Sequence, residues 1–238
     1  MPLNALFTTN VMNKYLKIFS LLWRIKRVEH ALSNTWRKHT NEAHLSISRR
    51  MASVVHKSHI IRNEMLHLIN NLQYYILFEV IESSWENFLE QVKVSQDLDH
   101  LIEAHNLYLD TISEKCLLSS PDLVDDLYKV MEIVIKFTKT QDTFYLYALQ
   151  EDSNFENNLS MLKEQELSEK YSLQRTKVIP TSNNVELPHD WNIQIYSISQ
   201  EYTKMFQSLM SKLGRHSDDK LQSLQFRLDF NDFYDRNK

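Results

Sequence analysis

The sequence predicts an all-α protein: an elongated bundle of about six to seven helices with one long central helix. Glycine is nearly absent, because Gly214 is the single glycine among 238 residues, and only 4 residues are proline. Glycine permits tight turns and lets the backbone approach bound phosphate closely. Its scarcity therefore argues against tight hairpins and against glycine-rich nucleotide-binding loops. Apolar residues also recur every three or four positions, which is the spacing of a buried helix face.

The first helix is expected from residue 11 to about Arg37, after an extended stretch over residues 1–10. Thr9 or Asn10 offers a side-chain oxygen that can cap its free N–H groups. The apolar positions at helical spacing are Val11, Tyr15, Ile18, Phe19, Leu22, Ile25 and Val28.

The central helix is expected over residues 45–81. It carries two apolar stripes, and a helix with two apolar faces is packed between several neighbours. Ser83 or Ser84 is expected to break this helix and to cap a short helix that contains Trp85.

Start signals mark the next two helices. Ser95 and Asp97 are expected to open the first of them. Ser120, Pro121 and Asp122 combine a cap, a proline in the first turn and an acid near the positive end of the helix dipole. The apolar residues of this helix, up to about Ala148, are expected to face the core.

The composition changes over residues 152–189, which are polar and contain two of the prolines. We interpret this stretch as a long exposed insertion, partly disordered, with a helical patch at 159–175. Beyond it, Asp190 is expected to cap a helix that Gly214 stops. A last helix is expected from about Ser217.

Glu64 and His67 lie one helical turn apart, which is the spacing of half of a di-iron bundle site. A di-iron bundle needs a second Glu-x-x-His pair on another helix and two further inward glutamates. The only other match, Glu186 and His189, is interrupted by a proline in the polar insertion. The lone Cys116 lies in an apolar stripe, which favours a reduced, buried and unreactive thiol. We therefore expect no metal, no cofactor and no enzymatic activity.

The charge is distributed unevenly along the chain. Residues 1–62 carry 11 Lys and Arg against 2 acidic residues, whereas residues 63–238 carry 16 against 29. A basic block indicates an acidic partner, which is nucleic acid, a membrane surface or an acidic protein. The alternative is a solvated helix face balanced by the acidic remainder of the same domain. No apolar run approaches 18 residues, so no transmembrane segment is expected.

Three stretches resemble a known family. The opening of the C-terminal, Grip-type domain of γ-tubulin complex proteins is similar to PLNALFTTNVMNKYLKIFSLLWRIKRVEHAL at residues 2–32. The middle of that domain is similar to residues 63–118, which begin NEMLHLINNLQYYILFEVIESSW, and its end closely matches LQFRLDFNDFY at residues 224–234. Within the family, these sequence motifs are most similar to the third core component of the γ-tubulin small complex.

The resemblance implies a helical domain over residues 1–238 that binds γ-tubulin, with residues 152–189 at a variable insertion of the family. Other γ-tubulin complex proteins would be contacted mostly through an N-terminal domain that this chain lacks. The chain is thus expected to be a fragment or truncated product that retains γ-tubulin binding and loses ring assembly. The implied location is the cytoplasm and cytoskeleton, at a microtubule organising centre such as the centrosome or spindle pole body.

The implied function is to hold γ-tubulin as a template to which α/β-tubulin adds, without nucleic acid as a partner. The rival interpretation is a basic helical module that binds nucleic acid or acidic membrane. Because tubulins are acidic, cations of the N-terminal quarter are the candidate contact residues. They are Lys14, Lys17, Arg24, Lys26, Arg27, Arg49, Arg50 and Arg62.

Overall fold

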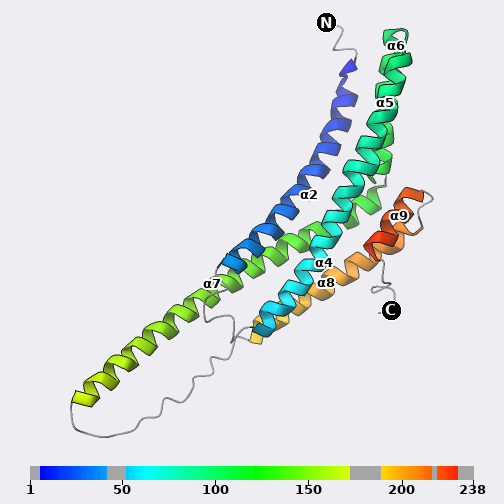
Figure 1. Cartoon of the computed structure of the whole chain (residues 1–238). Helices are drawn as coiled ribbons and strands as arrows, with labels where there is room; N and C mark the ends of the chain where they lie inside the picture. Colours follow the sequence, from blue (N-terminus) through cyan, green and yellow to red (C-terminus); the bar gives the residue numbers. More distant parts are fainter. Residues whose placement is uncertain (1–5, 42–51, 119, 172–188, 216–218, 230–238) are drawn as a thin grey trace.

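The structure is a computed structural model that describes residues 6–41, 52–118, 120–171, 189–215 and 219–229. Every regular element within these ranges is helical, which confirms the predicted all-α class. Figure 1 shows that the helices form an elongated bundle. No helix in the described ranges has the length and apolar character needed to cross a membrane.

Seven α-helices and one π-helical segment make up the described part of the chain. In order they are α2 (Thr9–Asn41), α4 (Ala52–Tyr74), the π-helical segment η1 (Tyr75–Glu82), α5 (Ser83–Val94), α6 (Leu98–Lys115), α7 (Pro121–Tyr171), α8 (His189–Leu213) and α9 (Asp219–Leu228). The helix α7 packs along α8 and α2, and α4 contacts α2, α8 and α9. The predicted central position of α4 is therefore confirmed.

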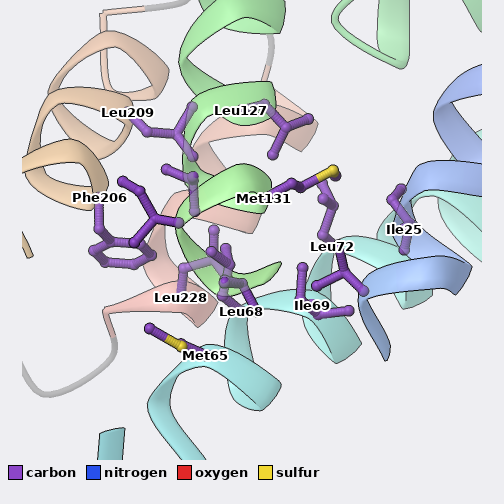
Figure 2. Close-up of a cluster of buried hydrophobic side chains, with 14 of the residues drawn as sticks. Ile25, Met65, Leu68, Ile69, Leu72, Leu127, Met131, Phe206, Leu209 and Leu228 are labelled. Atoms are coloured by element: carbon purple, nitrogen blue, oxygen red, sulfur yellow. The ribbon is translucent and has the colours of Figure 1, made fainter. Parts of the chain in front are cut away.

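One apolar core runs through these helices. Figure 2 shows its middle, where Met65 and Leu68 of α4 lie near Phe206 of α8 and Leu228 of α9. All four side chains are buried. The core thus joins helices that are far apart in the sequence, and its burial is the main stabilising term of the fold.

Two predicted helix starts are confirmed and one is shifted. Asp97 caps α6, since its Oδ1 accepts a hydrogen bond from the backbone N–H of His100 at 2.9 Å. The helix α7 begins at Pro121, as predicted. The cap of α2 is Thr8 rather than Thr9 or Asn10, because its Oγ1 accepts from the N–H of Val11 at 3.3 Å.

The predicted break at Ser83 and Ser84 is wrong. A capping residue needs an extended backbone, but Ser83 is helical with φ −59° and ψ −39°, as is Glu82. The π-helical segment η1 joins α4 to α5 without interruption. Its wider turns shift the register, and so Tyr75 and Val80 stay buried before the segment ends and Ser84 is buried after it.

The helix α7 does not end at the change in composition near residue 152. It continues to Tyr171 and is 51 residues long. Its second half projects away from the other helices (Figure 1), and the side chains described from 153 to 164 are exposed. Polar residues without apolar periodicity therefore continue this helix in solvent. Residues 172–188 of the predicted insertion lie outside the described residues.

Candidate binding surface

The helix α2 presents one face to the core and leaves the other to solvent. Its core face consists of Val11, Ile18, Leu21, Ile25, Val28 and Leu32, all of which are buried. These residues follow a spacing of three or four, so they lie on one side of the helix. The opposite side holds most of the candidate cations.

The candidate cations of α2 divide into paired and open groups. Lys14 forms an ion pair with Asp110 of α6, and the Nζ of Lys26 lies 2.8 Å from Oε2 of Glu29. Lys17 and Arg27 are exposed on the outer face. The acidic partners partly neutralise the two paired lysines. The positive potential on the exposed face of α2 therefore comes mainly from Lys17, Arg24 and Arg27.

Arg24 and Arg27 border a groove between α2 and α7 of about 490 Å³. The guanidinium of Arg24 lies over the ring of Tyr128, 4.5 Å from its centroid, a cation–π arrangement that holds it in place. Across the groove, α7 contributes Lys136 and Lys139. These two lysines could not be identified from the sequence, because only tertiary packing brings α7 beside α2.

Arg62 does not belong to this surface. Its side chain is 7% exposed, its guanidinium lies 4.2 Å from the ring centroid of Trp36, and burial lowers its pKa. We therefore exclude it from the candidate surface. Arg49 and Arg50 lie outside the described residues.

The structure also reveals an apolar stripe on the outer face of α2. Met12, Leu16, Phe19 and Trp23 are exposed, and the last two reach 62% and 64%. The rings of Phe19 and Trp23 stack with 6.2 Å between their centroids. Phe19, grouped from its spacing with the apolar inner positions, instead points to solvent. We define these four residues with Lys17, Arg24 and Arg27 as the outer surface of α2.

This combination has the character of a protein-binding surface. Stacked aromatics that are exposed on a helix favour burial against another protein. The flanking cations add attraction to an acidic partner. Interfaces commonly obtain much of their binding energy from such aromatic and arginine side chains.

Glu64 and His67, the candidate metal ligands, do not form a metal site within the described residues. His67 is exposed, and Glu64 borders a groove between α4 and α8. Across the described ranges, no three His, Cys, Asp or Glu side chains are grouped to hold a metal. The ring of His105 is buried, and its Nε2 lies 2.8 Å from the hydroxyl of Tyr15. Cys116 is buried, which confirms that part of the prediction, and its burial raises the pKa of the thiol to about 12.

Comparisons with known proteins agree with the resemblance in the sequence. The family model described as gamma tubulin complex component C-terminal matches residues 1–234. Gamma-tubulin complex component 3 homolog of Xenopus laevis is 34% identical over 98% of this chain and 26% of that relative. Spindle pole body component 98 of Dictyostelium discoideum is 37% identical over 100% of this chain and 27% of that relative.

Human gamma-tubulin complex component 3 is 33% identical over 98% of this chain and 26% of that relative. The chain thus spans about a quarter of the length of the curated relatives it matches. A family match over nearly all of the chain, together with the helical fold, leads to one conclusion: this chain belongs to the γ-tubulin complex component family and corresponds to its C-terminal part.

Proposed function

We propose that this chain is a γ-tubulin-binding domain that presents γ-tubulin as a template for α/β-tubulin assembly. The observation that carries the proposal is the family match over residues 1–234. The relatives it matches are named as γ-tubulin complex components or spindle pole body components. The proposed domain covers residues 1–238, with the polar insertion at 152–189, and acts without catalysis of its own.

The outer surface of α2 is the proposed contact with γ-tubulin. Phe19 and Trp23 would supply the apolar anchor, because a partner that covers them removes two exposed rings from water. Lys17, Arg24 and Arg27 would attract the acidic partner and raise the association rate. Lys14 and Lys26 lie on the same helix and contribute less, since each already has an acidic neighbour.

The wider setting follows from the relatives. Other γ-tubulin complex proteins are proposed partners of the longer protein, since relatives similar to this chain carry that name. The proposed location is a microtubule organising centre, either a centrosome or a spindle pole body, within the cytoplasm and cytoskeleton.

A charge reversal tests the proposed surface. Arg24→Glu combined with Arg27→Glu should slow association with γ-tubulin and flatten the salt dependence of the rate, because it inverts the charge that attracts the partner. The matched control is Lys163→Glu combined with Lys204→Glu, which changes the net charge equally on exposed positions of α7 and α8. Surface plasmon resonance at several salt concentrations measures both.

The same salt series separates the proposal from the rival nucleic-acid or membrane module. That module would bind duplex DNA, single-stranded RNA or phosphatidylserine vesicles with a steep salt dependence. We expect γ-tubulin to bind more tightly than any of these probes. Equal rates for the charge-reversed and control proteins would contradict the α2 surface, and preferential binding to a polyanion would contradict the function.

A further inference from the structure

The α5–α6 hairpin carries a second open surface, at the end of the bundle where α2 begins (Figure 1). A groove of about 600 Å³ runs between the two helices. Its apolar lining includes Phe88 and Val94 from α5, and Leu107 and Tyr108 from α6. Val94 is 78% exposed and Leu107 is 55% exposed. The groove therefore offers apolar side chains that no described part of the chain covers.

The groove is bordered by negative charge. The hairpin sequence from residue 83 to residue 116 contains 7 acidic residues and 2 basic ones. The lining itself holds one acid and one base, Glu90 of α5 and Lys115 of α6, and Glu86 precedes Glu90 by one helical turn. On α6, Glu103 lies one turn before Leu107, and Glu114 lies one turn after Thr111 of the lining.

These four glutamates are exposed and lie on both helices. A groove that exposes apolar side chains and has an excess of acidic residues on both helices complements a helix with one apolar stripe and basic edges. The helix α5 has 12 residues, so the groove is about 18 Å long at 1.5 Å per residue and accommodates about three helical turns.

We infer that the α5–α6 groove binds a basic amphipathic α-helix of a partner protein. Apolar residues of that helix pack on Val94 and Leu107, and its lysines and arginines face the glutamates on either side. This interaction goes beyond the proposed binding of γ-tubulin, because it uses a surface of opposite charge on other helices. Its partner is thus chemically distinct from acidic tubulin.

A designed peptide tests the inference on the full chain. The probe is a fluorescein-labelled helix of 18 residues, about five turns, built from leucine on one face and lysine on the others. Fluorescence anisotropy should show saturable binding with one peptide per chain. The same peptide with glutamate in place of lysine should not bind, because the glutamates that border the groove repel it.

Two pairs of variants locate the binding. Glu103→Lys should weaken binding about fivefold, and Leu107→Ala about tenfold, because they remove a charge contact and an apolar contact. Glu164→Lys and Leu146→Ala are the matched controls on α7, since both positions are exposed, and they should bind as the wild type does. Circular dichroism verifies that all four variants retain the helix content of the wild type.

Three results would overturn the inference: no saturable binding of the lysine peptide, equal binding of the glutamate peptide, or equal affinities for groove and control variants. Sedimentation velocity of the chain alone tests the other occupant, a second copy presenting its own basic α2 face. Self-association that Leu107→Ala abolishes would assign the groove to that second copy and would also overturn the inference. None of these outcomes depends on γ-tubulin, so the inference and the proposed function fail separately.

Discussion

Removal of the aromatic pair on α2 should weaken γ-tubulin binding without destabilising the fold. Phe19 and Trp23 are 62% and 64% exposed, and aromatic side chains have roughly 150–250 Å² of surface. A partner that covers the exposed part therefore removes roughly 100–150 Å² per ring from water, worth about 2.5–4 kcal/mol each at about 25 cal/mol per Å². Losses from side-chain ordering and imperfect packing reduce this to about 2 kcal/mol, or about thirtyfold in Kd.

The assay is isothermal titration calorimetry of γ-tubulin with Phe19→Ala, Trp23→Ala and the double variant. The free energy of unfolding, measured in urea, should change by less than about 0.5 kcal/mol, because both side chains are exposed and alanine favours a helix. Tyr196→Ala on α8 is the matched control, with a ring that is 64% exposed on another helix. The reasoning is refuted if the double variant binds with the wild-type Kd, or if Tyr196→Ala weakens binding equally.

Three further predictions concern the stability of the fold and are measured by urea unfolding. Burial lowers the pKa of His105 below its ordinary value of 6.5, so the stability contributed by the neutral ring is present above 6.5 and is lost as the pH falls through the folded-state pKa. His105→Gln should therefore lose less stability between about pH 7.5 and about pH 5.5 than the wild type, and an identical loss would contradict this. Asp126 is buried, and loss of hydration alone would raise the pKa of its carboxyl group. Hydrogen bonds from Lys212 and Ser208 outweigh that effect, so the pKa is lowered. Asp126→Asn should cost about 1 kcal/mol at neutral pH, since it breaks the charge-assisted pair with a half-exposed lysine; no change would show that the pair contributes nothing. Ser83→Ala should not destabilise the protein, because Ser83 is inside a continuous helix; a loss of about 1 kcal/mol would instead indicate the cap.

Local signals predicted the helices well because they act over a few residues. Asp97 caps α6 through its own neighbour, and Pro121 starts α7 by its fixed φ angle. Such effects need no knowledge of the rest of the chain. The central helix was also predictable, since its two apolar stripes require neighbours on two sides.

Features that depend on register or packing were not predictable in the same way. Two consecutive serines at 83 and 84 are typical of a helix end, but the π-helical segment before them joins α4 to α5 and the helix continues. Arg62 resembles a surface cation in sequence, yet packing places it against Trp36. Lys136 and Lys139 join Arg24 only because α7 lies beside α2.

The outer surface of α2 illustrates the same limit within one helix. Helical spacing identifies the apolar residues of α2, but it does not say which of them meet a neighbouring helix. Val28 is buried, while Phe19 is exposed and stacks on Trp23. A surplus of large apolar residues beyond one stripe was the available signal for an interface.

The central claim is that this chain binds γ-tubulin directly. Its most direct test is co-purification of the full chain with γ-tubulin at low salt, followed by sedimentation velocity of the eluted material. The proposed function predicts a complex with one γ-tubulin per chain that persists for the Tyr196→Ala protein and is lost for the double variant of Phe19 and Trp23. If γ-tubulin does not co-purify with the folded wild-type chain, the central claim is contradicted.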